Sequence, residues 1–462
     1  MRVLVVGGGV SGLYLSDLLS RQRKTFEISV LNRESSVGGR LLSCRSINGQ
    51  ILEMGAMRIP CHHQLTLGLC SELGLHLKEF NGSCLNSQNY ELEADLDEDG
   101  NIQFLPSSWI LDRGIKEFCQ VDNCYDVQSE WLMFKLALRL SDLGLELGDL
   151  SFAEFVRLVL KPNEEKLFWN GIGYDYLRLQ DVSATHSLRN GFTVSKDSKS
   201  HFTVSTGMQS IATEIHKRIS MSGVRVFTNE KAISVHRRSN GYRVKTRKGN
   251  EFECDLLVLA IPPKEAVRLN QASSFLDKEY LAAIHDIGDY SSTKTYAMFP
   301  RNTSLIERLD SGFFRTGLSI RQGHFNPCGS TSSHDYQTVL AEYKNLLGDK
   351  TDLKTGPSSI TNIVNCLNQM LKTTLDEPAF WSTINWSTTQ SCVAAHYWKI
   401  GANPNKTICK LQSLDDNVAF TGEAISMGQG WVEGALSSAR TLVNVILSRY
   451  EKGLTAGEGL KS

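Results

Sequence analysis

The start of the chain changes its hydrophobic pattern twice within a short stretch. Residues 2–6 are almost entirely apolar, as in a buried strand, and glycines follow directly. The leucines from Leu13 to Leu19 then recur at helical spacing, and residues 26–31 form a second apolar run. This order of strand, glycine-rich turn, helix and strand predicts a βαβ unit.

The pattern is different between about residues 64 and 200. Apolar residues recur at helical spacing over 64–77, 127–145 and 152–160, with loops expected near 82–108. This stretch is therefore predicted to be largely helical. A second mixed segment covers about 290–385 and includes a loop rich in Gly, Ser and His near 323–335.

Strand and helix alternate again from about residue 204. A helix is predicted from Gly207 toward Ile219. Short strands are predicted at 224–227, 233–237, 242–246 and 254–260. The last segment, 417–447, again predicts strand, turn and helix.

These patterns predict an α/β fold in which a doubly wound cofactor-binding domain is discontinuous in sequence. That domain is expected to comprise residues 1–75, 204–290 and 385–450. The insertions at 76–203 and 291–384 are expected to form a mixed and helical substrate-binding domain, and residues 451–462 a disordered tail.

Composition excludes several classes of protein. The 462 residues include 49 basic and 50 acidic side chains, so no basic excess favours nucleic acid as a partner. No apolar run is long enough for a transmembrane helix, and no signal peptide is evident. The 11 cysteines are scattered without a Cys-x-x-Cys pair, which favours the cytoplasm and predicts no metal site.

The motif Gly7-x-Gly9-x-x-Gly12 joins the first predicted strand to the first helix. In a dinucleotide site, such glycines allow a tight turn, a close approach of the pyrophosphate, and close packing of helix on strand. The helix N-terminus then faces the phosphates with free N–H groups. Asn32 stands where an acidic residue usually binds the ribose, with Glu34 nearby.

Val37-Gly38-Gly39-Arg40 provides a second glycine pair just after the βαβ unit. It would permit another close backbone approach to the pyrophosphate, and Arg40 could neutralise the phosphates. This second cluster favours a flavin dinucleotide.

Several motifs together resemble the flavin-containing amine oxidase family, and most closely its L-amino-acid oxidase branch. They are Gly7–Gly12, Val37–Arg40, Gly55-Ala56-Met57-Arg58-Ile59-Pro60 with His63, Phe420-Thr421-Gly422-Glu423, and Gly430-Trp431-Val432-Glu433-Gly434. The resemblance implies an amine-oxidase-like fold and FAD. The covalent attachment position of some related families falls on Val393, so noncovalent FAD is expected.

By this resemblance, a set of residues along the two glycine motifs, the 55–58 segment and the last helix is expected to bind FAD. They are Gly7, Gly9, Val10, Ser11, Gly12, Asn32, Arg33, Gly39, Arg40, Gly55, Ala56, Met57, Arg58, Ala232, Gly422, Glu423, Gly430, Trp431, Val432 and Ala435.

The resemblance also implies the substrate site. Arg58 would hold a carboxylate with its planar fork of donors, and Trp431 would form an aromatic wall beside the flavin. Lys294 would hold a water near the flavin ring. Further substrate ligands would be Tyr343, Gly430, Tyr397 and Trp398. Each of these side chains could instead be structural: a salt-bridged arginine, core aromatic rings or an exposed strand lysine.

The sequence therefore predicts an FAD-dependent oxidoreductase that oxidises the C–N bond of an L-amino acid or a carboxylate-bearing derivative. The products would be an imino or keto acid, ammonia and hydrogen peroxide, with O₂ as acceptor. Alternatives on the same scaffold are an amine or polyamine oxidase, an amino-acid monooxygenase, and a desaturase or cyclase. A noncatalytic FAD-binding protein is the alternative from another class, and a homodimer is compatible with the chain.

Overall fold

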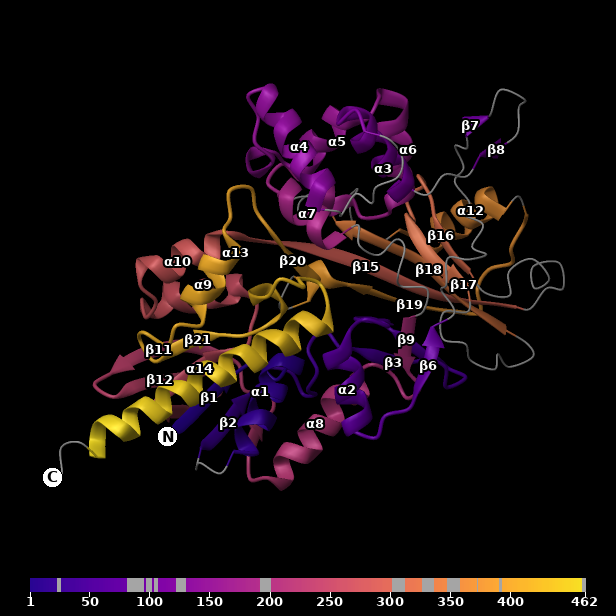
Figure 1. Ribbon diagram of the computed structural model, residues 1–462. Helices are drawn as coiled ribbons and strands as arrows, with labels where there is room; N and C mark the ends of the chain where they lie inside the picture. Colours follow the sequence, from indigo (N-terminus) through magenta and orange to yellow (C-terminus); the bar gives the residue numbers. More distant parts are fainter. Residues whose placement is uncertain are drawn as a thin grey trace.

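The computed structural model is drawn in Figure 1. It describes residues 1–22, 26–80, 95–96, 102–103, 107–121, 130–191, 201–300, 312–325, 336–346, 358–371, 373–389 and 393–458. Most of the loops expected at 82–108 and 323–335, and the first residues of the helix expected at 127–145, lie outside these ranges.

A parallel five-stranded sheet draws its strands from the beginning, middle and end of the chain. Its order is β10 (Arg225–Phe227), β2 (Glu27–Leu31), β1 (Arg2–Val6), β14 (Leu256–Leu259) and β21 (Val418–Phe420). In β1, Val5 pairs with Val30 on one side and with Val258 on the other. Because both faces of such a sheet are covered, the strands are mostly apolar, and the predicted α/β fold is confirmed.

Different elements cover the two faces of this sheet. The helices α1 (Val10–Ser20), α8 (Gln209–Met221) and α14 (Val432–Glu458) share one apolar core with it. The opposite face packs against the antiparallel strands β11 (Ala232–Arg238), β12 (Gly241–Thr246) and β13 (Glu251–Cys254), and against α9 (Pro263–Ser273) and α10 (Lys278–His285). Figure 1 shows these layers in the lower part of the molecule, beside both termini.

A second, larger sheet is built on the long strand β15 (Ile287–Pro300). Its order is β16 (Gly312–Arg315), β17 (Gln322–Phe325), β18 (Tyr336–Leu346), β15 and β19 (Phe380–Asn385), and β20 (Ala395–Trp398) pairs with the first part of β15. One face packs on α12 (Ile360–Leu371). The other face packs on the segment that follows β4 (Ile51–Glu53), including Met54 and Met57.

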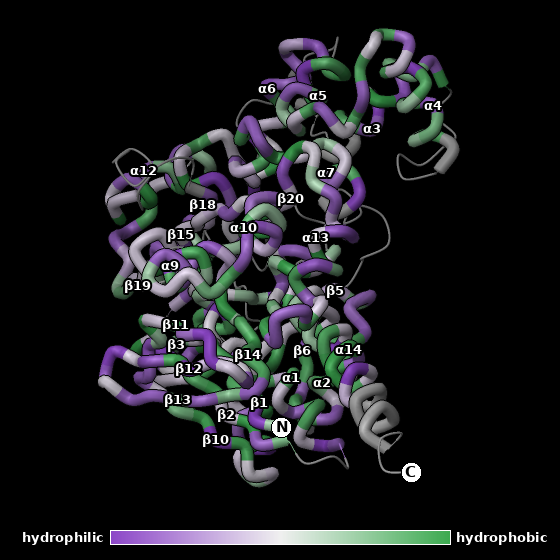
Figure 2. Tube along the Cα trace, turned by 90° about the vertical axis from the view of Figure 1, so that its left-hand side faces the viewer, coloured by the Kyte–Doolittle hydropathy of each residue, from purple (hydrophilic) through white to green (hydrophobic). Residues whose placement is uncertain are grey.

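The predicted helical insertion forms a separate cluster. It contains α3 (Ser107–Phe118), α4 (Glu130–Asp142), α5 (Phe152–Val159), α6 (Pro162–Ile172) and α7 (Ala184–Gly191). Figure 2 shows α3, α4, α5 and α6 at the end of the molecule opposite the two termini. A capping box between Ser151 and Glu154 starts α5. No helix of the described residues is long and apolar enough to cross a bilayer.

Two predicted elements differ in extent. The helix expected at 64–77 ends earlier, since α2 spans Gln64–Glu72 and Gly74 adopts φ +67°, a left-handed conformation typical of a helix end. The chain then forms β6 (Leu77–Phe80), which pairs with β9 (His201–Val204). The last helix, α14, extends to Glu458, within the segment 451–462 that was expected to form a disordered tail. Residues 451–458 contain no proline that would stop it.

The remaining short elements connect these layers. They are β3 (Ser43–Arg45), β5 (Ile59–Pro60), β7 (Asp95–Leu96), β8 (Ile102–Gln103), α13 (Pro404–Leu411), and the 3-10 turns Leu147–Asp149, Asp175–Arg178, Trp386–Thr388 and Glu423–Ile425.

Candidate active site

The glycines of the first motif have different surroundings at the carboxyl edge of the parallel sheet. A Cβ on Gly7 would lie 2.3 Å from the Ala260 carbonyl oxygen, and one on Gly12 would lie 2.2 Å from the Gly7 carbonyl oxygen. Packing therefore forbids a side chain at both positions. A Cβ on Gly9 would meet no heavy atom within 4 Å. The open space over Gly9, at the N-terminus of α1, fits an approaching pyrophosphate.

The second glycine pair lies beside the first motif. The Gly38 N–H donates to the Gly8 carbonyl at 2.9 Å, and Gly39 adopts φ +60°. The two turns thus form one backbone surface. The hydroxyls of Ser11 and Thr421 are 2.7 Å apart, which ties α1 to the residue that follows β21. Val10 opens α1, and Val432 and Ala435 lie in the first turn of α14.

Asn32 and Arg33 have partners within their own region. The Asn32 side-chain amide donates to the carbonyls of Glu34 and Ser36, both at 2.8 Å, and so fixes the loop after β2. Arg33 pairs with Glu34 at 3.0 Å. Asn32 therefore fixes the conformation of this loop. A carboxylate at position 32 could not do so, because it has no N–H to donate to the two carbonyls. Ala232 begins β11 close to the same loop, since the Glu230 N–H donates to the Asn32 carbonyl.

Glu423 joins the cofactor edge to the start of the last helix. Its buried carboxylate accepts from Arg40, from His396 Nδ1 and from the Gly430 N–H, the last at 2.9 Å. Burial opposes the charge, but His396 and Arg40 together hold the pKa of Glu423 below its usual range. The carboxylate is therefore ionised, and it fixes Arg40 and the turn at Gly430. His396 was not identified from the sequence, because no local motif marks it.

Hydrogen bonds to its backbone carbonyls hold the segment from Glu53 to Gly55. Lys294 donates to the carbonyls of Glu53 and Gly55, and the Tyr296 hydroxyl donates to that of Glu53 at 3.1 Å. A Cβ on Gly55 would lie 1.9 Å from the Arg40 carbonyl oxygen, so only glycine fits. The next residues, Ala56 and Met57, continue this segment to Arg58. Lys294 is thus buried at the predicted site and not an exposed strand lysine.

The side chain of Glu53 is itself buried beneath this segment. Its carboxylate accepts from the Met208 N–H and the Ser43 hydroxyl, both at 2.7 Å. Burial is the main reason that its pKa is raised to about 7, although Ser43, Met208 and Lys294 act in the opposite direction.

The predicted substrate residues Arg58, Trp431, Lys294 and Tyr343 come together from distant parts of the chain. The Arg58 guanidinium lies 6.0 Å from the centre of the Trp431 ring, and Lys294 Nζ lies 5.1 Å from the centre of the Tyr343 ring. Lys294 and Tyr343 are paired across β15 and β18, so their side chains share one face of the sheet. Arg58 Nη2 also donates to the Tyr174 hydroxyl at 3.0 Å. Tyr174 was not among the site residues predicted from the sequence.

Unlike the four residues above, Tyr397 and Trp398 pack in apolar cores of the protein. The Tyr397 hydroxyl donates to Asp181 at 2.8 Å, and its ring packs with the helical cluster. Trp398 is buried in the core beside the parallel sheet. These positions favour the structural interpretation for both rings.

His63 lies at the edge of the site. Its ring is 5.0 Å from that of Trp431, edge to face. Burial lowers the pKa of His63 to about 4, against a smaller opposite influence of Glu433. His63 is therefore neutral at pH 7, and could accept a proton only weakly.

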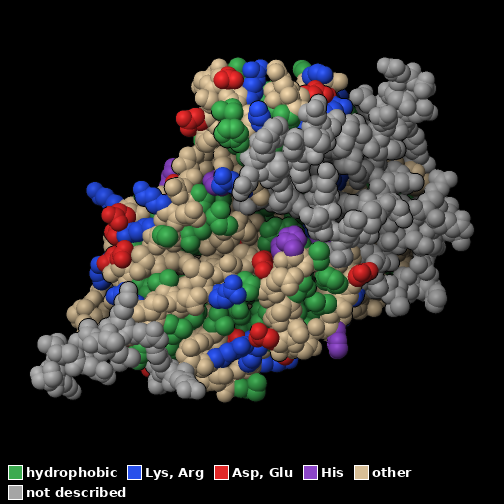
Figure 3. Space-filling view, in the orientation of Figure 1, with side chains coloured by type: hydrophobic (Ala, Val, Ile, Leu, Met, Phe, Trp, Pro, Cys, Tyr) green, Lys and Arg blue, Asp and Glu red, His purple; other side chains and the backbone are tan. Residues whose placement is uncertain are grey.

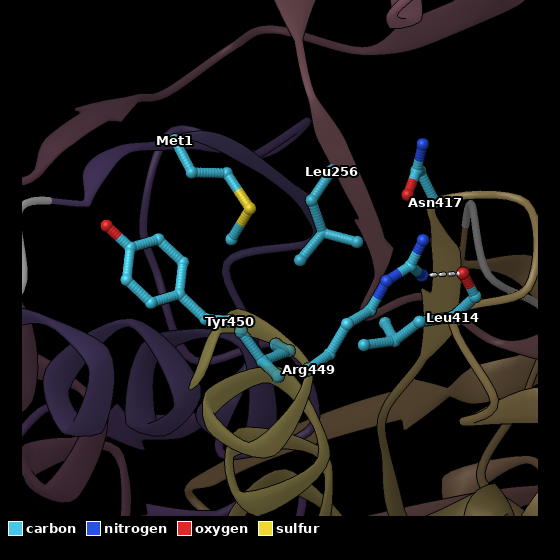
Figure 4. A pocket seen from close by; sticks show the side chains of 7 residues that line it. Met1, Leu256, Leu414, Asn417, Arg449 and Tyr450 are labelled. Atoms are coloured by element: carbon cyan, nitrogen blue, oxygen red, sulfur yellow. Dashed lines mark hydrogen bonds between the residues drawn. The ribbon is translucent and has the colours of Figure 1, made fainter. Parts of the chain in front are cut away.

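A separate cavity lies at the other edge of the parallel sheet. Its volume is about 310 Å³, and Figure 4 shows its lining by Met1, Leu256, Asn417, Arg449 and Tyr450. Met1, Leu256 and Asn417 lie at the amino ends of their strands, whereas the glycine motif follows the carboxyl end. Ligands of such sheets bind at the carboxyl ends, so this cavity is distinct from the cofactor site.

The molecular face drawn in Figure 3 carries interspersed acidic and basic side chains.

The described residues contain no group of three or more His, Cys, Asp or Glu side chains that could hold a metal ion.

The fold, together with the glycine turns at the carboxyl edge of the parallel sheet, defines a class of dinucleotide-dependent oxidoreductase. A family model described as flavin containing amine oxidoreductase matches residues 10–447. The chain belongs to this family, and it is an FAD-dependent amine oxidoreductase. The open space over Gly9, the adjoining turn at Gly39 and the ionised Glu423–Arg40 pair fit that cofactor.

The sequence identity between this chain and individual relatives is low. The chain is 23% identical to "Flavin-dependent L-tryptophan oxidase RebO" of Lentzea aerocolonigenes, covering 96% of this chain and 98% of that protein. It is 22% identical to an L-amino-acid oxidase of Bungarus fasciatus, covering 95% and 85% respectively. A putrescine oxidase variant with redesigned cofactor binding has a similar fold, with a TM-score of 0.70, 18% identity and coverage of 97% and 99%.

Proposed function

We propose that the protein oxidises an L-α-amino acid, or a derivative that keeps the α-carboxylate. One observation carries this proposal: Arg58 lies against Trp431 and the Tyr174 hydroxyl, beside the segment expected to run along the flavin. A permanently charged, planar guanidinium suits a carboxylate better than it suits a simple amine. The full-length relatives named as L-tryptophan and L-amino-acid oxidases support the same substrate class.

Each residue would have a defined role. Arg58 would bind the carboxylate, and the Trp431 ring would limit the position of the neutral amine and exclude water. Lys294, held by two carbonyls, would place a positive charge near the reacting end of the cofactor. FAD supplies the two-electron acceptor for oxidation of the C–N bond. The resulting imino acid would hydrolyse to a keto acid and ammonia, with O₂ as the final acceptor.

The cofactor site would be formed by the residues predicted above, with FAD held noncovalently. Acid precipitation of the protein should then release yellow FAD into the supernatant. Flavin that stays in the pellet after denaturation would show a covalent bond.

The principal alternative is oxidation of a simple amine or polyamine. Its only structural support is the fold likeness to putrescine oxidase, which does not extend to the substrate. An anaerobic flavin-bleaching screen against the common L-amino acids and against amines, followed by mass measurement of the product, tests both. Bleaching by amino acids with formation of keto acids supports the proposal, and bleaching by amines alone contradicts it.

A further inference from the structure

Tyr174 is the residue that the helical insertion contributes to the Arg58 site. It follows α6 and is partly buried, and its hydroxyl oxygen accepts a hydrogen bond from Arg58 Nη2 at 3.0 Å. Since the guanidinium can only donate, the phenolic proton must point elsewhere. Among the described residues, Arg58 is the hydrogen-bond partner of this hydroxyl.

The residues on both sides of Tyr174 are held by Arg321 and Gln322, at the start of β17. Gly173 ends α6 with φ +72°, and its carbonyl accepts from the buried Gln322 side chain at 3.0 Å. On the other side, Arg321 donates to the Asp175 carboxylate at 2.8 Å; Arg321 also donates to the Trp169 carbonyl within α6 at 2.6 Å. The position of Tyr174 is therefore set by the large sheet as well as by its own helix.

The same strands carry a second phenol to this place. Tyr343 on β18 is paired with Gln322 on one side and with Lys294 on the other. Tyr174, Arg58 and Tyr176 all act electrostatically on Tyr343, and Arg58 is hydrogen-bonded to Tyr174. The Arg58 guanidinium and the phenols of Tyr174 and Tyr343 are thus neighbours, although they come from three distant segments.

We propose that Tyr174 is a ligand of the substrate carboxylate, donating its hydroxyl proton to one oxygen while Arg58 supplies the charge. This inference rests on the proposed function, because it assumes an α-carboxylate. The hydrogen bond from the guanidinium polarises the phenol and makes it a stronger donor. A hydrogen bond to a charged group contributes about 1.5–3 kcal/mol, so its loss should weaken binding about 10- to 150-fold.

The test compares Tyr174→Phe with wild-type holoenzyme on three probes: L-tryptophan, tryptamine and indole-3-propionate. They share a side chain and differ in the carboxylate or the amine. Anaerobic stopped-flow reduction gives the apparent Kd and rate for the first two, and calorimetry gives the Kd of the third without turnover. We expect Tyr174→Phe to weaken both carboxylates about 10-fold or more and tryptamine less than 2-fold, with little change in the limiting reduction rate.

Two controls separate a ligand from a residue that only positions Arg58. Tyr176→Phe removes a hydroxyl two residues away, where the ring stacks on Tyr290 at 4.0 Å, and should leave all Kd values unchanged. In an Arg58→Met background, Tyr174→Phe should still weaken indole-3-propionate, because the direct bond does not need Arg58.

Equal effects on all three probes, no effect on any, or no further effect in the Arg58→Met background would overturn the inference. Failure of the proposed function has a different signature. In that case no L-amino acid would reduce the flavin, whatever residue occupied position 174.

Discussion

The proposed cofactor edge and the proposed substrate side of this protein are built in different ways. At the cofactor edge, most groups lie in short runs of sequence: the turns at 7–12 and 37–40, and the segment 422–435. On the substrate side, Arg58, Tyr174, Lys294 and Tyr343 come from four distant segments, and the bond from Arg58 to Tyr174 spans 116 residues. A backbone surface for a pyrophosphate can be encoded locally, whereas a set of converging side chains depends on the whole fold.

Arg58→Met should break the substrate side and leave the cofactor edge intact. Loss of the one cation that pairs with a desolvated carboxylate costs about 2–5 kcal/mol, so the apparent Kd for an L-amino acid should rise about 30-fold or more. The FAD content and its dissociation constant should stay close to those of the wild type. Unchanged kinetics with every accepted substrate would refute the carboxylate role.

Glu53 links the two regions, and its titration gives a pH test. Its pKa is about 7 in the folded protein against an ordinary value of 4.5, so folding favours the protonated form. The resulting stabilisation is complete below about pH 4.5 and is lost as the pH rises through 7. Relative to Glu53→Gln, the wild type should therefore lose roughly 3 kcal/mol of unfolding free energy across this window.

Urea unfolding of both proteins at several pH values measures this difference. The pKa values of His63 and His201 are each lowered to about 4 by burial and have the opposite effect, but they are common to both proteins. Parallel pH profiles would show that Glu53 does not titrate in this range.

Two glycines of one motif should separate folding from cofactor binding. Gly9→Ala introduces a methyl group into open space at φ −75°, so the apoprotein should melt normally while its FAD affinity falls about 10-fold or more through lost phosphate contacts. Gly12→Ala instead places Cβ 2.2 Å from a carbonyl oxygen and should destabilise the apoprotein by about 1–3 kcal/mol. Thermal melting and FAD titration check both variants. Equal FAD affinity in Gly9→Ala and wild type would contradict the assignment of that space.

Lys294→Met tests the contact between the regions. The variant loses the positive charge of Lys294 and its hydrogen bonds to the carbonyls of Glu53 and Gly55. The glycine turns at 7–12 and 37–40 are left unchanged. FAD should remain bound, while flavin reduction or reoxidation should slow about 10-fold or more, within the usual range for a positioned proton or charge group. Unaltered rates in both half-reactions would exclude the proposed role.

The smallest effect is expected outside both regions. Tyr397→Phe removes the hydrogen bond to Asp181 and should cost about 1 kcal/mol of stability without changing the apparent Kd of the substrate. A change in Kd with unaltered stability would instead place Tyr397 in the substrate site, as the sequence first suggested.

The sequence predicted the strand, glycine turn and helix of the proposed cofactor edge because glycine spacing and apolar strands are local signals. Resemblance to a family also predicted Arg58, Lys294, Tyr343 and Trp431; the fold brings them near one another, and their roles stay predictions. Tyr174 and His396 could not be identified, since their importance arises from packing between distant segments. For Tyr397 and Trp398, an aromatic residue near a motif gave no indication of which way its ring points.

The most direct test of the central claim compares one L-amino acid with its decarboxylated amine. Anaerobic stopped-flow reduction of the flavin by L-tryptophan and by tryptamine, in wild type and Arg58→Met, gives four second-order rate constants. Wild type should prefer the amino acid by about 30-fold or more, and Arg58→Met should abolish most of that preference. Equal or faster reduction by the amine in wild type, or a preference that survives in Arg58→Met, would contradict the account.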